Sequence, residues 1–250
     1  MAALMDPQRV WRGPFSSWQQ AVDQAFNPNL TWSERAWTSR QEEFLHVAGV
    51  DAKNPPRPST LPMAAGLLNA RRIVDYGGGA GWVFALLKKS CPNLKLTSYT
   101  VAELPDVVQA FNQLASADPR LTYVTFQDIS LLPGADLLYA NASLHYGETE
   151  RPFLHAAVAL GPVPHITLDG FLANPEREFY LVQHVYGHDI PVHIPRLSDS
   201  LNALRQTGYR VTSCLPQLAP AGGVYRYDLP LGHFGAPYTE TRRYFITASG

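Results

Sequence analysis

The stretch Val74-Asp75-Tyr76-Gly77-Gly78-Gly79-Ala80-Gly81 decides the fold expected for this chain. The segment 71–75 predicts a short strand that runs into it, and the segment 82–89 predicts a helix that follows it. Glycines in such a turn let the backbone approach a ligand closely and adopt angles that other residues avoid. A glycine-rich connection between a strand and a helix is typical of nucleotide-binding α/β proteins, although an ordinary structural turn uses the same residues.

Strands and helices alternate from this stretch to the end of the chain. The apolar segments predict seven strands, at residues 71–75, 96–101, 122–126, 135–140, 165–171, 210–214 and 243–248. Helices are expected between them, at residues 82–89, 104–115, 152–160 and 197–207. We therefore expect an α/β protein with a mostly parallel, doubly wound sheet, closed by an antiparallel C-terminal hairpin.

The first 60 residues have a different pattern, which we interpret as helical. One amphipathic helix is expected over 15–22, and another over 31–47 with Thr31 or Ser33 as its N-cap. Four of the five tryptophans lie here, so these helices either pack on the main domain or form a lid over a ligand. The proline-rich segment 54–58 predicts a stiff linker. The expected organisation is a helical lid (1–60) on the domain formed by 61–250.

Composition excludes several classes of protein. The chain has 250 residues, enough for one domain, with 46% hydrophobic and 16% charged residues and a formal net charge of −1. Such a balance predicts no general attraction to nucleic acid or to anionic lipid. The apolar runs are too short to span a bilayer, the N-terminus lacks a signal-peptide core, and there are two cysteines. We expect a cytoplasmic protein, and composition alone does not indicate its chemistry.

Three motifs together resemble those of class I S-adenosylmethionine-dependent methyltransferases. The D-x-G-x-G-x-G run resembles the first motif of that family, and the segment 103–108 (ELPDVV) resembles the acid-Leu-Pro-x-Val-Val segment of small-molecule O-methyltransferases. The segment 126–129 (FQDI) stands where the family places an acid at the adenine. The resemblance implies a Rossmann-like methyltransferase fold and S-adenosylmethionine as methyl donor or substrate.

The resemblance also implies which residues bind the cofactor. Glu103 would accept hydrogen bonds from the ribose hydroxyls, although its spacing from the glycines is slightly long and Thr100 is an alternative. Asp128 would bind the adenine amino group, but a solvated loop acid is the ordinary alternative. The implied cofactor-binding residues are Asp75, Gly77, Gly79, Gly81, Glu103, Asp128 and Ile129.

A narrower resemblance spans nearly the whole chain. The segments 11–21, 141–146 (NASLHY) and 180–185 (YLVQHV) are similar to those of a family of small bacterial methyltransferase-like proteins. Some members of that family are natural-product enzymes that cyclise S-adenosylmethionine to azetidine-2-carboxylic acid and release methylthioadenosine. The resemblance implies a small-molecule substrate and this ring closure as the leading reaction, with methyl transfer to a small-molecule hydroxyl or amine as the alternative.

Candidate catalytic residues follow the fourth predicted strand. Asn141 and Ser143 stand at the carboxyl edge of the sheet, where either oxygen can hold the substrate amine. An aromatic face would stabilise the sulfonium, and the resemblance favours Tyr180 over Tyr139 and Tyr146, for each of which core packing is the ordinary alternative.

His145 leaves the reaction open. It lies in a segment that resembles the Leu-His-Asp-Trp segment of O-methyltransferases, in which the histidine deprotonates an acceptor hydroxyl. It would equally take the proton of the substrate ammonium before ring closure, or serve only a structural role. A protein that binds S-adenosylmethionine without catalysis is the alternative from another class.

A histidine-rich segment and a glycine-containing segment near the C-terminus are assigned no catalytic or metal-binding role. His184, His188, Asp189 and His193 stand close in sequence, but Gly187 and Pro191 interrupt any continuous helix there. We therefore expect a polar active-site loop and no metal. The segment 222–227 is expected to be a hairpin connection between the last two strands.

Overall fold

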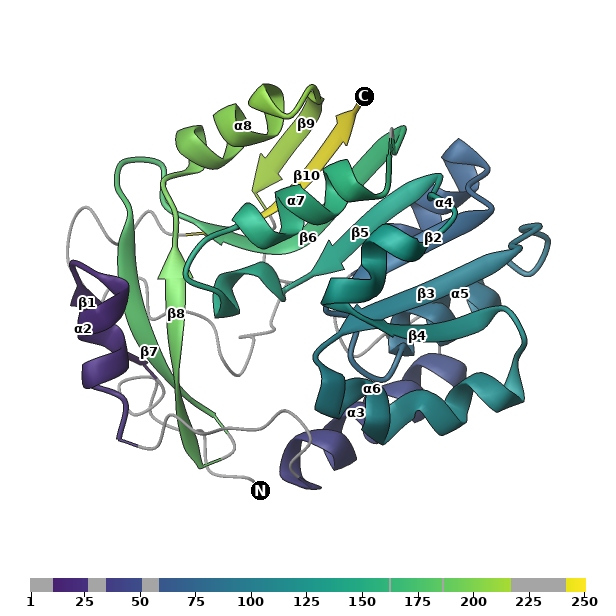
Figure 1. Cartoon of the computed structure of the whole chain (residues 1–250), viewed down its shortest axis with the longest axis horizontal. Coiled ribbons are helices and arrows are strands. Elements are labelled where there is room, and N and C mark those ends of the chain that lie inside the picture. The colour runs from purple at the N-terminus through teal and green to yellow at the C-terminus, as the bar shows by residue number, and fades with distance from the viewer. Residues whose placement is uncertain (1–10, 27–34, 51–58, 162, 186, 217–241) are drawn as a thin grey trace.

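A computed structural model describes residues 11–26, 35–50, 59–161, 163–185, 187–216 and 242–250. Its main sheet has seven strands in the order β4-β3-β2-β5-β6-β10-β9 (Figure 1). All seven predicted strands are present: β2 (Arg72–Tyr76), β3 (Ser98–Glu103), β4 (Leu121–Thr125), β5 (Leu137–Asn141), β6 (His165–Ala173), β9 (Arg210–Pro216) and β10 (Arg242–Ser249). The strands from β4 to β6 are parallel, while β10 runs antiparallel to both β6 and β9. The predicted fold class is confirmed.

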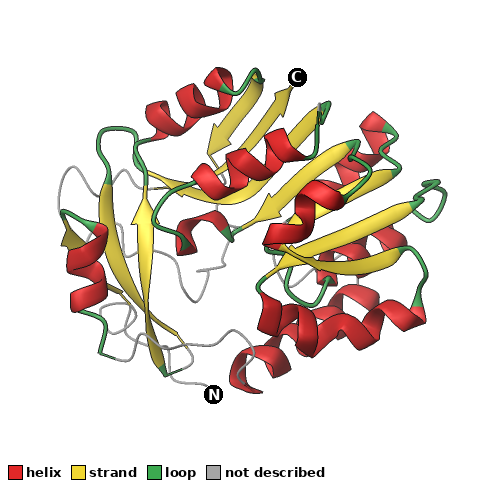
Figure 2. Ribbon diagram, in the orientation of Figure 1, coloured by secondary structure: helices red, strands yellow, loops and turns green. Residues whose placement is uncertain are grey.

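Helices cover both faces of this sheet (Figure 2). Four helices share a core with one face: α3 (Arg35–Val50), α4 (Leu61–Leu68), α5 (Trp82–Ser90) and α6 (Pro105–Phe111). On the other face lie α7 (Arg151–Ala159) and α8 (Leu197–Gln206). The central strands β2, β3, β5 and β6 thus bury side chains on both faces, which explains why each is a nearly continuous apolar run in the sequence.

A second sheet was not predicted. Its strands are β1 (Trp11–Phe15), β7 (Phe179–Val185) and β8 (His188–Ile194), in the order β1-β7-β8. β7 and β8 form a hairpin between β6 and α8, and β1 joins it antiparallel from the far end of the chain. Phe179 and Leu181 of β7, and Val192 and Ile194 of β8, are buried beside Trp11 in a separate small core. Burial of every second residue is the two-residue periodicity of a strand.

The N-terminal region therefore departs from the predicted all-helical pattern. Residues 11–15 form a strand, and the short helix α2 (Trp18–Asp23) begins only after Ser17, whose Oγ accepts a hydrogen bond from the Gln20 N–H. The second predicted helix is present as α3, and α4 was missed. The proposed caps Thr31 and Ser33, the linker 54–58 and the segment 222–227 lie outside the described residues.

Within the described ranges, none of the helices combines the length and the apolar character that crossing a bilayer requires.

Candidate active site at the carboxyl edge of the sheet

The glycine loop occupies the turn between β2 and α5. Gly77, Gly79 and Gly81 have φ angles of 73°, 58° and 75°, in the left-handed region where a side chain is strained. The Gly77 N–H donates to the Ala102 carbonyl oxygen of β3 at 2.8 Å. The loop is therefore tied to the end of the neighbouring strand, and its glycines serve the backbone conformation directly.

Glu103 lies at the end of β3, directly across from this loop. Its Oε1 accepts a hydrogen bond from the Gly79 N–H at 3.0 Å and its Oε2 accepts one from the Leu104 N–H at 2.9 Å. The side chain is 7% exposed, and burial raises the pKa of Glu103 to about 7 against the opposing effect of these two N–H groups. Each carboxylate oxygen can accept a further hydrogen bond, so Glu103 retains capacity for two hydroxyl donors.

Asp75 is buried beneath the same loop. The Tyr99 hydroxyl donates to its Oδ2 at 2.5 Å, while its Oδ1 has no hydrogen-bond partner among the described residues. A Cβ on Gly78 would approach Asp75 Oδ2 to 2.5 Å, so only glycine fits over this carboxyl. Burial raises the pKa of Asp75 to about 7, and the charges of Glu103 and Asp169 add to this increase.

A second buried carboxyl, Asp169, was missed by sequence reasoning. It is 1% exposed in β6, pairs in register with Asn141 of β5, and accepts hydrogen bonds from Tyr139 and Thr60. The signal was an acid inside an otherwise apolar strand, since a charged group at such a position needs specific partners. Asn141 is half-buried, and its Nδ2 donates to the Tyr139 hydroxyl at 3.0 Å.

Ser143 and His145 follow Asn141 at the same edge. The Ser143 Oγ donates to the Tyr76 carbonyl oxygen at 2.8 Å, next to Gly77. His145 lies in the short 3-10 helix η3 (Leu144–Tyr146), is 5% exposed, and packs against the Tyr146 ring at a centroid distance of 4.2 Å. Tyr146 in turn donates to Gln183 Oε1 of β7 at 3.1 Å, which joins this edge to the small sheet.

The adenine candidates lie after β4. Asp128 is exposed in the 3-10 helix η2 (Phe126–Leu131) and accepts a hydrogen bond from Thr125 Oγ1 at 2.6 Å, whereas Ile129 is buried. Thr100, the alternative to Glu103, lies within β3 and its Oγ1 is 3.0 Å from Thr122 Oγ1 of β4. Glu103, and not Thr100, reaches the glycine loop by a hydrogen bond.

Tyr180 lies apart from the residues just described. Its ring stacks on His193 of β8 at 5.1 Å and meets Trp18 of α2 edge-on at 6.2 Å. Its hydroxyl donates to Glu178 Oε1 at 2.9 Å. Trp18 belongs to α2, His193 to β8, and Glu178 directly precedes β7. The Tyr180 ring lies on the face of the small sheet opposite the core that contains Phe179 and Leu181.

The histidine-rich segment forms the β7–β8 hairpin. His184 Nδ1 is 2.8 Å from Asp189 Oδ1, and Arg12 of β1 donates to Asp189 Oδ2 at 2.5 Å. His193 Nε2 is 2.7 Å from Glu178 Oε1. Across the described ranges, no three His, Cys, Asp or Glu side chains converge as metal ligands would.

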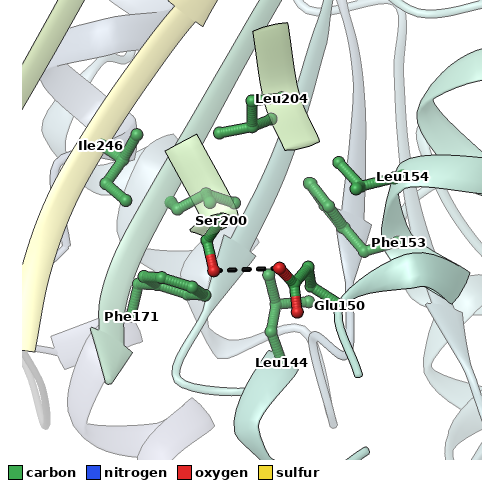
Figure 3. Close-up of a pocket in the computed structure, with 9 residues that line it drawn as sticks. Leu144, Glu150, Phe153, Leu154, Phe171, Ser200, Leu204 and Ile246 are labelled. Carbon is green, nitrogen blue, oxygen red and sulfur yellow. Dashed lines mark hydrogen bonds between the residues drawn. The ribbon is translucent and has the colours of Figure 1, made fainter. Parts of the chain in front are cut away.

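A small pocket lies on the face covered by α7 and α8 and reaches Leu144 of η3, directly after Ser143 (Figure 3). Its lining is apolar apart from Ser200 and Glu150, and Ser200 Oγ donates to Glu150 Oε1 at 2.9 Å. A volume of about 10 Å³ holds no more than one water molecule. This pocket is too small for a substrate.

Helix α3 brings two further residues to the glycine loop: Trp37, one of the four N-terminal tryptophans, and Gln41, which sequence reasoning missed. A Cβ on Gly79 would come within 3.0 Å of the Gln41 amide and 3.6 Å of the Trp37 ring. Both side chains are buried. The N-terminal segment thus packs directly on the glycine loop through α3.

Comparisons with known proteins agree with this geometry. The family described as "O-methyltransferase domain" matches residues 36–151, which include the glycine loop and Asn141. No curated protein matches the chain. Human N-acetylserotonin methyltransferase, solved with S-adenosylmethionine, superposes with a TM-score of 0.51 at 16% identity, over 93% of this chain and 65% of that one.

An O-methyltransferase from neocarzinostatin biosynthesis, solved with S-adenosyl-L-homocysteine and 1,4-dihydroxy-2-naphthoic acid, superposes with a TM-score of 0.53 at 14% identity. That match covers 94% of this chain and 67% of the other. Identities this low show the fold. The chain has the Rossmann-like fold of class I methyltransferases.

Proposed function

We propose that this protein is an S-adenosylmethionine-dependent enzyme whose site lies at the carboxyl edge of β2, β3 and β5. The observation that carries the proposal is Glu103, a buried carboxyl held by the Gly79 N–H with capacity for two more donors. Two hydroxyls of a ribose would use that capacity. In this proposal Gly77, Gly79 and Gly81 shape the cradle, and Asp128 and Ile129 receive the adenine.

The charge of the site also fits a cationic ligand. Asp75, Glu103 and Asp169 are buried together at this edge, and none of the hydrogen bonds and ion pairs described for them involves a lysine or an arginine. Uncompensated buried carboxyls are costly, and a positive charge nearby favours their ionised form. The sulfonium and ammonium groups of S-adenosylmethionine would provide that compensation.

We infer that the reaction is methyl transfer to a small-molecule hydroxyl or amine. When bound, S-adenosylmethionine supplies a sulfonium that makes its methyl carbon, and also its Cγ, electrophilic. The match to an O-methyltransferase domain over 36–151 supports methyl transfer. His145, directly after the edge that contains Asn141 and Ser143, would remove the proton of the acceptor.

Ring closure to azetidine-2-carboxylate, with release of methylthioadenosine, is the second candidate. The sequence resemblance and the position of Asn141 favour it, because Asn141 would hold the amine that attacks Cγ, and His145 or Ser143 would assist. Tyr180 needs to reach the sulfonium in this reaction. Its present partners, Trp18 and His193, lie on the side of α2, so we predict a rearrangement of β7 if Tyr180 participates.

One incubation separates these reactions. The purified protein is mixed with S-adenosylmethionine alone, and then with a panel of phenols, catechols and amines, and the products are identified by mass spectrometry. Methylated acceptor and S-adenosylhomocysteine in equal amounts would support methyl transfer. Methylthioadenosine with an equal amount of azetidine-2-carboxylate, without any acceptor, would establish ring closure instead. Binding without turnover in either mixture would indicate a non-catalytic binder.

A further inference from the structure

The Tyr139 hydroxyl stands at the centre of a buried hydrogen-bond network. It is 2.7 Å from Asp169 Oδ2, 2.8 Å from Ser59 Oγ and 3.0 Å from Asn141 Nδ2, and the side chain is fully buried. A phenol hydroxyl has one proton to donate and two lone pairs to accept with. These three partners therefore use its whole capacity.

The hydrogen bonds that Asp169 accepts set the direction of the bonds at Tyr139. Asp169 also accepts hydrogen bonds from the Thr60 N–H at 2.6 Å and from Thr60 Oγ1 at 2.5 Å, as a carboxylate does. A carboxylate has no proton to give, so the single proton of Tyr139 is donated to Asp169. Ser59 and Asn141 must then both be donors to Tyr139.

We propose that Tyr139 is a positioning residue that holds the Asn141 side chain with its amide nitrogen inward and its carbonyl oxygen as the acceptor offered to substrate. This inference rests on the proposed binding of S-adenosylmethionine at this edge, and it adds that Asn141 holds the ammonium group of the bound ligand. An ammonium group only donates hydrogen bonds, so it requires the oxygen of the amide and is repelled by its N–H groups.

The network also accounts for the positions of Asp169, Ser59 and Thr60, which do not contact the glycine loop in any described hydrogen bond. Asp169 interrupts an apolar strand, and Ser59 and Thr60 lie just before α4, far from β5 in sequence. Oxygen and nitrogen of an asparagine amide are nearly equal in size, so packing alone would hold either orientation. The proton direction imposed by Asp169 through Tyr139 favours the orientation in which Asn141 Nδ2 points toward the Tyr139 hydroxyl.

The first test observes the amide itself in the ligand-free protein. The side-chain signals of Asn141 are assigned in ¹⁵N-labelled protein by their loss in Asn141→Ala. One Asn141 Nδ2 proton should exchange at least about tenfold more slowly than those of exposed Asn202, and Tyr139→Phe should abolish the difference. Equally fast exchange of both Asn141 protons in the wild type would overturn the proposal, even if Tyr139→Phe failed to fold.

The second test is a double-mutant cycle on S-adenosylmethionine binding, measured by calorimetry. Tyr139→Phe should weaken binding about fivefold or more in the wild type, but less than about 1.5-fold in Asn141→Ala, because its effect acts through Asn141. Tyr99→Phe is the matched control, since Tyr99 is an equally buried tyrosine that donates to a carboxyl, Asp75. Its effect should be the same in both backgrounds.

The outcomes separate the two proposals. Equal effects of Tyr139→Phe in both backgrounds would overturn the positioning role while the binding function stands. Absence of S-adenosylmethionine binding in the wild type would overturn the proposed function and, with it, the role of Tyr139 toward that ligand. The exchange measurement would still decide whether the amide is held as described.

Discussion

At the scale of single residues, the site depends on hydrogen bonds between the Glu103 side chain at the end of β3 and backbone N–H groups beside it. The Glu103 carboxyl is held by one N–H from the glycine loop and one from its own strand end. Its orientation is therefore established before any ligand binds, and a preorganised acceptor loses little entropy when it binds hydroxyl donors.

Glu103→Gln should weaken S-adenosylmethionine binding by about 1.5–3 kcal/mol, or roughly tenfold to hundredfold, because an amide nitrogen cannot accept from an N–H or a ribose hydroxyl. Calorimetry measures the change. Asp106→Asn, a neighbouring acid in the first turn of α6, is the control and should leave the affinity unchanged. Equal affinities of Glu103→Gln and the wild type would remove Glu103 from the site.

Gly79→Ala should lower both stability and affinity. A side chain at a φ of 58° costs about 1–2 kcal/mol, and its Cβ would lie 2.4 Å from Gln41 Oε1. Gly66→Ala is the matched control, since Gly66 is in helix α4 with nothing within 4 Å of the added Cβ. Thermal unfolding should show a lower Tm for Gly79→Ala and an equal or higher Tm for Gly66→Ala. Tolerance of both substitutions would contradict this account of the loop.

At the scale of elements, the small sheet joins the N-terminus of the chain to a hairpin inserted after β6. Arg12 of β1 and the Phe26 N–H after α2 both donate to Asp189 of β8, whose side chain is 7% exposed. Hydrogen bonds from His184 and Phe26 and the charge of Arg12 lower the pKa of Asp189 despite its burial. The Asp189 carboxylate thus holds β1 at Arg12 and the residue after α2, Phe26, against the small sheet. Closure of the N-terminal region as a lid over a ligand stays a prediction.

Arg12→Ala should destabilise the protein by about 2 kcal/mol, because it leaves a buried carboxylate with fewer donors, and should lower the Tm by roughly 4–8 °C. Hydrogen exchange should also accelerate in β1. The control is Arg196→Ala, which breaks an exposed ion pair with Asp199 and should leave the Tm unchanged. If the two variants had the same Tm, the Asp189 anchor would be unimportant.

At the scale of the whole molecule, the buried carboxyls couple ligand binding to pH. The pKa values of Asp75 and Glu103 are raised to about 7, chiefly by burial, so the folded ligand-free protein holds protons that the unfolded chain has already lost. Because the folded state binds more protons between about pH 4 and pH 7, these two groups make its stability fall as pH rises through that window.

A bound cation lowers the pKa values of Asp75 and Glu103, because a nearby positive charge favours the ionised form of a carboxyl. S-adenosylmethionine affinity should therefore increase from pH 6 to pH 8, with protons released on binding, and calorimetry in buffers of different ionisation enthalpy measures that release. In Glu103→Gln the release should be smaller. An affinity that does not change between pH 6 and pH 8 would show that ligand binding does not alter the protonation of Asp75 or Glu103.

Local sequence patterns were sufficient for the main sheet but not for the small one. The strands β2, β3, β5 and β6 are buried on both faces, so each is an apolar run that is recognisable on its own. β1 has five residues, and its partner β7 lies more than 160 residues later in the chain. The pairing of β1 depends on β7, so the residues around β1 alone do not reveal that it is a strand.

The sequence by itself determined the glycine loop, the seven strands and the acid at the end of β3, because each depends on residues adjacent in the chain. Only the tertiary structure decided that Tyr139, Asn141 and Asp169 share one hydrogen-bond network, and that Tyr180 faces α2 instead of the Asn141 edge. The physical reason is that a side chain's face and partners are set by strand pairing and register, which join residues far apart in sequence.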